Sequence, residues 1–221
     1  MARAWDQRAI LLGYALLVSI ALLYSGLAPF DRTTWWLEVL PVLIALPLLL
    51  LTHHRFPLSP LLYLLITLHC LVLIAGGTYS YARVPLGFWV QEWLDLSRNP
   101  YDKLGHFMQG LVPALVAREI LLRRGYLLAT RMTSFLAICV AMAFSACYEL
   151  IEWWSALALG QGADEFLGTQ GDPWDTQSDM FSALIGSSFG MLCLSSRHNR
   201  QLLLLGWRSV GSAATSTSGV S

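Results

Sequence analysis

Six long apolar segments constrain this chain more than any other feature of its sequence. A helix that spans the hydrocarbon core of a bilayer needs about 20 mostly apolar residues, with roughly 17 as the practical minimum. The segments that meet this condition are Ala9–Leu27, Trp35–Thr52, Pro60–Tyr79, Leu104–Leu122, Met132–Trp154 and Asp179–Ser195. Because lipid offers the backbone no hydrogen-bond partners, each segment is expected to form an α-helix. The sequence therefore predicts an all-α polytopic membrane protein, a bundle of about six transmembrane helices.

The composition agrees with this prediction. Hydrophobic residues make up 56% of the 221 residues and charged residues only 13%, with a mean hydropathy of +0.55. A soluble domain carries about 25% charged residues. The formal net charge is zero, and no basic stripe indicates nucleic-acid binding. The lipid bilayer is the partner that the composition predicts.

The distribution of lysine and arginine predicts the orientation. With the amino terminus inside, the inner segments hold nine arginines and the outer segments hold Arg32, Arg83, Arg98 and Lys103. This excess favours cytoplasmic positions for both termini. We expect a transmembrane domain over residues 1–196, with a scaffold half (1–80) and a polar-site half (101–196), and a largely disordered cytoplasmic tail over residues 197–221. Trp89 and Trp93, four residues apart between two spans, predict a segment that lies along the interface.

A polar stretch, Leu167–Asp179, separates the last two apolar segments. It holds three aspartates, two glutamines and two threonines but no lysine or arginine. Two glycines and a proline predict a turn rather than a helix or strand. The residues of this stretch that we assign to a polar site are Thr169, Gln170, Asp172, Trp174, Asp175 and Asp179.

Polar residues of three predicted spans fall at the same depth. Asp102 and His106 lie four residues apart on one helix face, and Gln109 follows one turn later. Glu149 and Glu152 lie in the last two turns of an antiparallel span, and Asp175 and Asp179 open the last span. All of them are therefore expected in the outer layer of the membrane, where they would form one site with the polar stretch.

The residue types indicate two kinds of chemistry. The acids Glu149, Glu152, Asp172, Asp175 and Asp179 suit a hard divalent cation such as Mg²⁺, Mn²⁺ or Ca²⁺. Zinc fits less well because only one histidine is well placed. Candidates for acid–base work are Asp102, Lys103, His106 and Glu149, and Gln109, Gln170, Thr169 and Trp174 would complete the site.

Structural interpretations of the same residues stay open. Glu149 could form an ion pair with Lys103 or a hydrogen bond with Gln109, and His106 could bond to a neighbouring carbonyl or to Glu149. Lys103 could extend its ammonium group to the membrane–water interface, or it could be the cation that offsets the negative charge of the acids. The aspartates of the polar stretch could be turn formers and a helix cap. Away from the site, we expect His53, His54 and His69 to be structural, and Arg118 and Glu119 to reach the interface with Arg123 and Arg124.

Three segments resemble the YjdF-type family of bacterial inner-membrane proteins. They are Tyr101–Phe107 (YDKLGHF), Tyr148–Trp153 (YELIEW) and Leu167–Met180 (LGTQGDPWDTQSDM). The resemblance implies a multi-pass protein of the bacterial inner membrane and no established activity. A more partial resemblance to VanZ-like proteins rests on Asp102, Lys103, His106, Glu149, Asp179 and Gly186. That pattern has an asparagine where this chain has Ala183.

Three function classes follow from the predicted site. The first is an enzyme that hydrolyses, or transfers a group on, a lipid-linked or envelope substrate with a metal-bound or carboxylate-activated water. The second is a non-catalytic module that binds a partner through the polar stretch. The third is a proton-coupled transporter, against which stand the lack of inverted repeats and the confinement of ionisable residues to one leaflet.

Overall fold

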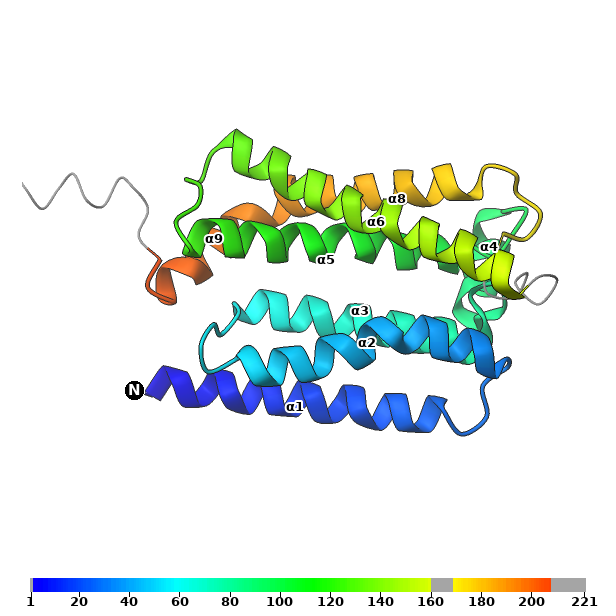
Figure 1. The fold of residues 1–221 in the computed structure, drawn as a ribbon, viewed down its shortest axis with the longest axis horizontal. Helices are drawn as coiled ribbons and strands as arrows, with labels where there is room; N and C mark the ends of the chain where they lie inside the picture. The colour runs from blue at the N-terminus through cyan, green and yellow to red at the C-terminus, as the bar shows by residue number, and fades with distance from the viewer. Residues whose placement is uncertain (1, 160–168, 208–221) are drawn as a thin grey trace, which may run out of the picture.

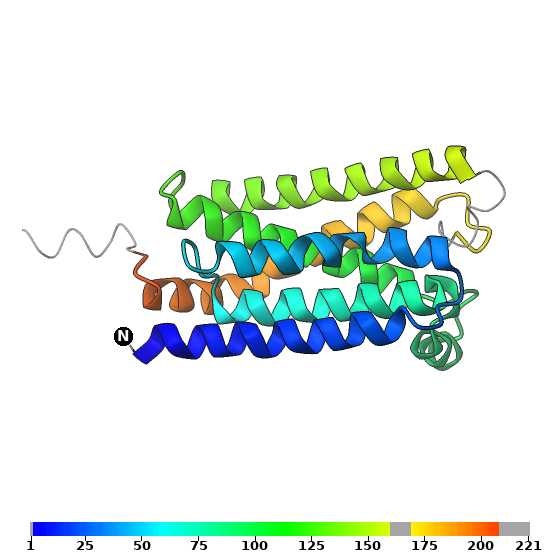
Figure 2. The same cartoon turned by 60° about the horizontal axis from the view of Figure 1, so that its bottom comes forward.

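The computed structural model describes residues 2–159 and 169–207, which form helices and contain no strand. Each predicted span corresponds to a helix, so the all-α prediction is confirmed. The six helices are α1 (Ala2–Ser25), α2 (Arg32–Thr52), α3 (Pro60–Tyr79), α5 (Tyr101–Arg123), α6 (Arg131–Leu159) and α8 (Asp175–Phe189). They run along the long axis of the molecule (Figures 1 and 2).

Within residues 2–159 and 169–207, four helical segments are long and apolar enough to cross a membrane: Gln7–Ser25, Arg32–Thr52, Pro60–Tyr79 and Arg131–Ala158. The other two long segments are more polar or shorter, since α5 carries charged residues at both ends and α8 has 15 residues. The count of six spans and the cytoplasmic position of both termini therefore remain predictions.

The last helix continues beyond the predicted end of the transmembrane domain. A π-helical segment, η3 (Gly190–Leu194), leads without a break into α9 (Ser195–Leu204). His198 and Leu202 of α9 are fully buried. The boundary expected at residue 196 thus falls inside a packed helical stretch, because His198 and Leu202 have partners in the bundle. Residues 208–221 of the expected tail lie outside the described residues.

A short connection closes one end of the bundle. It contains the 3₁₀ turn η1 (Tyr81–Arg83) and the helix α4 (Pro85–Leu94). Trp89 and Trp93 of α4 are largely exposed, as expected for a helix whose aromatic rings face an interface. In Figure 1, α4 lies at the same end as the start of α8.

The helix α5 is central to the bundle and packs against α3, α6 and α8. Its contact with α8 is close because two glycines occupy the crossing. A Cβ atom on Gly110 would collide with the backbone carbonyl of Ala183, and one on Gly186 with that of Phe107. Because the backbones touch there, side chains one or two turns away on α5 and α8 are brought into contact. This crossing positions the candidate site.

Candidate functional site

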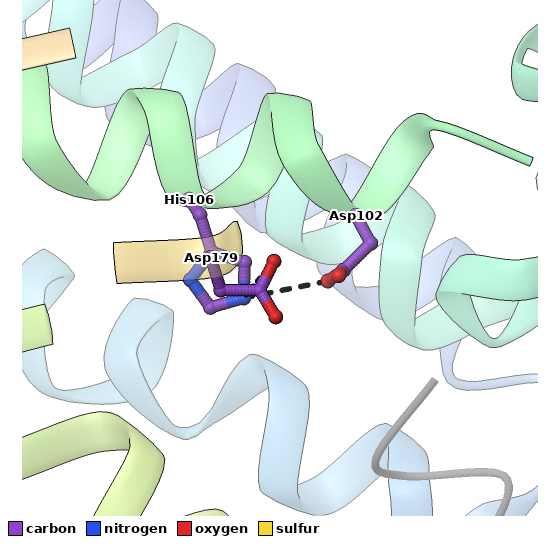
Figure 3. A group of neighbouring side chains, drawn as sticks. All are labelled: Asp102, His106 and Asp179. Atoms are coloured by element: carbon purple, nitrogen blue, oxygen red, sulfur yellow. Dashed lines mark ion pairs between the residues drawn. The ribbon is translucent and has the colours of Figure 1, made fainter. Parts of the chain in front are cut away.

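Asp102 and His106 of α5 meet Asp179 of α8 at the end of the bundle that α4 closes. All three side chains are buried, and one ligand atom of each lies within 4.8 Å of the others. Figure 3 shows the three side chains pointing toward one another. The Nε2 atom of His106 lies 3.4 Å from Asp102 Oδ1 and 3.7 Å from Asp179 Oδ1. These distances exceed the 2.7–3.2 Å typical of an N–H···O hydrogen bond.

The other ring nitrogen of His106 determines the tautomer. His106 Nδ1 lies 3.0 Å from Gln109 Oε1 and 3.7 Å from Glu149 Oε1. If Gln109 presents its amide oxygen to the ring, Nδ1 is the donor, because an amide oxygen only accepts hydrogen bonds. In the neutral ring Nε2 then presents its lone pair to two carboxylates. That arrangement is repulsive unless a proton or a metal cation lies between Nε2 and the aspartates.

Lys103 lies among the aspartates instead of extending to the interface. Its Nζ contacts Asp179, lies 2.8 Å from Asp175 Oδ1 and lies 3.5 Å from Asp102 Oδ2. The Lys103 side chain is 22% exposed. Of the two roles left open by the sequence, the geometry supports a cation that offsets the acids.

Arg98 holds the polar stretch against the start of α5. Its guanidinium lies 3.0 Å from Asp172 Oδ2 and 2.7 Å from Asp175 Oδ1, and it donates to the backbone oxygen of Thr169 at 2.8 Å. Burial lowers the pKa of Arg98, but the hydrogen bond and charge of Asp175 outweigh it and raise the pKa above its usual value. The sequence did not single out Arg98, although it is one of the few cations of the predicted outer loops.

A second pair of hydrogen bonds joins the polar stretch to the residues just before α5. Gln170 Oε1 accepts from the backbone nitrogen of Asn99 at 3.1 Å, and Gln170 Nε2 donates to the Asn99 oxygen at 3.0 Å. Thr169 contributes only its backbone oxygen to these contacts. Trp174 is 68% exposed, and its backbone nitrogen donates to Asp172 Oδ1 at 2.9 Å. Thr169, Gln170 and Trp174 therefore shape the loop rather than line the cluster around His106, and Leu167 and Gly168 lie outside the described residues.

The predicted acids have two sets of neighbours, which Lys103 joins because it contacts both Asp175 and Asp179. Asp172 and Asp175 are paired with Arg98, and Asp175 also with Lys103. Asp179 and Glu149 lie next to His106. The set with metal-ligand spacing among the described residues contains Asp179 together with Asp102 and His106, two residues that the sequence suggested for acid–base work.

A cavity of about 190 Å³ adjoins the cluster. Its polar lining includes Asp102, His106, Gln109, Tyr148 and Glu152, together with Glu38 of α2. Tyr148 donates to Glu38 Oε2 at 3.2 Å, and Glu38 is 2% exposed. Glu38 was not among the predicted site residues, because residues 1–80 were predicted to be a scaffold half. A lone acid inside the apolar segment Trp35–Thr52 was the available signal.

The cluster holds more acids than bases. Two buried carboxylate oxygens, Asp102 Oδ2 and Glu149 Oε1, have no hydrogen-bond partner within the described part of the chain. The carboxyl groups that line the cavity or contact its cations outnumber two permanent cations and His106. They are Glu38, Asp102 and Glu152, which line the cavity, Asp172, Asp175 and Asp179, which contact Arg98 or Lys103, and Glu149, which lies beside His106. Buried charge without a partner is costly, so the cluster favours added positive charge.

At the opposite end of α5, the positions of Arg118 and Glu119 differ from the prediction that both reach the membrane interface. Arg118 and Glu119 are buried instead of reaching the interface. Glu119 accepts from the Ser59 backbone at 3.0 Å, from Arg123 at 2.7 Å and from His198 Nε2 at 2.9 Å. Arg118 contacts His198 Nδ1 at 3.0 Å. The reason is α9, whose histidine was placed in the disordered tail and instead supplies the partner that keeps both residues inside.

Comparison with known proteins identifies the family. Residues 10–200 match the family model described as "Predicted membrane protein (DUF2238)". The chain is 62% identical over 192 residues to "Inner membrane protein YjdF" of Escherichia coli (strain K12), an alignment that covers 87% of this chain and 92% of that protein. No solved structure matches.

These matches confirm the YjdF-type resemblance and the location predicted from it, a multi-pass protein of the bacterial inner membrane. The VanZ-like outline remains a prediction from the residue pattern. The chain belongs to the DUF2238 family of predicted membrane proteins.

Proposed function

We propose that Asp102, His106 and Asp179 bind a divalent cation, and that the protein uses it to hydrolyse, or transfer a group on, a lipid-linked or envelope substrate. The observation that carries the proposal is the orientation of His106. Its Nδ1 lies 3.0 Å from Gln109 Oε1 and its Nε2 lies 3.4 and 3.7 Å from two carboxylate oxygens. A neutral ring that donates from Nδ1 directs its Nε2 lone pair at both carboxylates. Histidines that bind metals are held in this way by a partner on the second nitrogen.

The ligand types favour an oxygen-preferring cation. Two carboxylates and one imidazole suit Mg²⁺, Mn²⁺ or Ca²⁺ better than zinc, which prefers nitrogen and sulfur ligands. A cation would also supply the positive charge that the acid-rich cluster favours. Lys103 contacts both Asp175 and Asp179, so it can remain paired with Asp175 when Asp179 turns to a cation.

The chemistry assigned to the site is water activation. A divalent cation lowers the pKa of a bound water and stabilises negative charge on a carbonyl or phosphoryl oxygen. In hydrolysis, the water oxygen bonds to the phosphorus or carbonyl carbon of the substrate, the ester bond breaks, and the leaving oxygen takes a proton. Glu149, 3.7 Å from His106 and with one unpartnered oxygen, is the group we assign to accept the proton of the water.

The test is cation binding by the detergent-solubilised protein. Manganese bound per chain, measured after gel filtration, is compared for the wild type, Asp179→Asn and Asp95→Asn. Asp95 is exposed at the end of α4, with φ 52°, a conformation that asparagine also adopts. We expect about one ion per chain in the wild type and in Asp95→Asn, and loss of binding in Asp179→Asn. A folded wild-type protein that binds neither Mn²⁺, Mg²⁺ nor Ca²⁺ would refute the proposal and leave a proton on His106 Nε2 as the balancing charge.

A further inference from the structure

A large apolar cavity lies between the helix pair α2–α3 and the pair α5–α6. Its volume is about 510 Å³, within the roughly 300–1,000 Å³ of small-molecule sites. We call it the apolar groove. Its walls are almost entirely hydrocarbon, with Ala45 and Leu49 on α2, Ile66 on α3, Val116 and Ala117 on α5 and Val140 on α6. In Figure 1 the two helix pairs run as separate layers.

The apolar groove adjoins the polar cavity beside His106. Five residues line both: Pro41, His69, Leu73, Pro113 and Phe144. Two of them are prolines inside α2 and α5, where a proline removes a backbone hydrogen bond and bends the helix. We call these two adjacent spaces, one apolar and one with a polar lining, the elongated site.

His69 marks the junction of the two parts. Its Nε2 is buried and has no hydrogen-bond partner in the described part of the chain. The sequence analysis treated this histidine as structural. A buried ring nitrogen without a partner is costly, and at this position it can bond to a polar group that enters the cavity.

We propose that the elongated site binds a membrane lipid, with one hydrocarbon chain in the apolar groove and the polar linkage at its end in the cavity beside His106. This inference rests on the proposed function and names its substrate class. Three walls of the groove belong to α2, α3 and α6, the helices whose apolar character fits a membrane span. In a bilayer, a lipid chain is the apolar occupant available to such a groove.

The size of the polar cavity limits the group that reacts. Its volume of about 190 Å³ is below the roughly 300–1,000 Å³ of sites that enclose a whole small molecule. A phosphate or a glycerol ester fits this space, whereas a larger headgroup extends beyond it. The bond that is cut therefore lies at the junction of headgroup and chain, opposite the metal ligands.

The test uses a phospholipid with a diazirine in its acyl chain, incorporated with the protein into vesicles of phosphatidylethanolamine and phosphatidylglycerol. After illumination, labelled peptides are mapped by mass spectrometry. We expect labelling of groove-lining residues to fall at least fivefold in Ala117→Phe, which fills the groove. Ala45→Phe fills it from the opposite wall and replaces Ala117→Phe if that variant does not fold. Ala158→Phe, at an exposed position of α6 far along the helix from the groove-lining Val140 and Phe144, is the matched control and should label like the wild type.

The two proposals fail in different ways. Equal groove labelling in the wild type, Ala117→Phe and Ala45→Phe would overturn the lipid inference while leaving cation binding in place. Loss of groove labelling in Ala158→Phe would also overturn it, because that position lies several helical turns from the groove-lining residues of α6. Asp179→Asn should keep the groove label and lose the cation. If the wild type binds no cation and yet labels in the groove, the metal chemistry fails and the lipid site stands.

Discussion

Replacing Gln109 by leucine is expected to weaken cation binding about 10- to 100-fold, although Gln109 is not itself a proposed ligand. Gln109 Oε1 lies 3.0 Å from His106 Nδ1, and in the proposed site the Nδ1–H donates to it and keeps Nε2 directed at Asp102 and Asp179. Leucine has a similar size and no acceptor. Without that acceptor, the hydrogen can move to Nε2 and the ring can rotate, so the lone pair is no longer presented to the cation.

The magnitude follows from the loss of a partner of a metal-binding histidine. Such substitutions typically lower metal affinity by about 10- to 100-fold, which corresponds to about 1.4–2.7 kcal/mol of binding free energy. Gln109→Glu keeps an acceptor at the same position and makes it stronger, because a charged acceptor forms the shorter and tighter bond. Its affinity should equal or exceed that of the wild type.

Titration calorimetry with MnCl₂ in detergent measures the affinity directly. Gln177→Leu makes the same exchange at an exposed position of α8 and should bind as the wild type does. The reasoning would be refuted if Gln109→Leu bound manganese as tightly as Gln177→Leu, or if Gln109→Glu lost as much affinity as Gln109→Leu. Either result would show that the Nδ1 partner does not control the metal-binding nitrogen.

Three further predictions concern stability, measured by SDS-induced unfolding in detergent micelles. Asp31→Ala removes the N-cap of α2, whose Oδ1 accepts a backbone N–H at 2.7 Å, and should cost about 1 kcal/mol. That hydrogen bond lowers the pKa of Asp31 below 3.8, so the difference from the wild type should be complete above pH 4 and shrink as the pH falls further. Gly186→Ala should destabilise by about 1–3 kcal/mol because its methyl group would strike the backbone of α5, whereas Gly13→Ala, with open space around it, should not destabilise. His198→Ala removes two buried hydrogen bonds at about 1–3 kcal/mol each, and His54→Ala, at an exposed position, should change stability by less than about 0.5 kcal/mol.

The helices were predictable because span length and apolarity are local properties. The segment Pro60–Tyr79 was predicted with the bounds that α3 has, since a proline opens it and a polar connection follows. The starts of α5 and α8 were placed late, at Leu104 and Asp179, because their first turns are polar. Those turns are helical at Tyr101 and Asp175, where buried partners rather than lipid surround the polar side chains.

The sequence could predict that the polar residues lie at one depth in the membrane. It could not predict which acid is paired with which cation. Helix length alone placed His106, Glu149 and Asp179 in one layer. Asp172 and Asp175 are paired with Arg98 because the loop before α5 lies against the polar stretch. The sequence around Arg98 has no hydrophobic periodicity from which this contact could be predicted. Glu38 reaches the cavity only through the packing of α2 beside α3, and this long-range contact is not encoded in any local pattern.

The two ends of α5 show why one polar network is a site and the other is structural. Both carboxylate oxygens of Glu119 have donors, at distances from 2.7 to 3.3 Å, from Ser59, Arg123 and His198. That carboxylate needs no further charge. At the other end, Asp102 Oδ2 and Glu149 Oε1 have no hydrogen-bond partner in the described part of the chain, although both residues are also buried. A protein that balances one buried acid so fully and leaves others open beside a cavity has room there for a charge that arrives with a ligand.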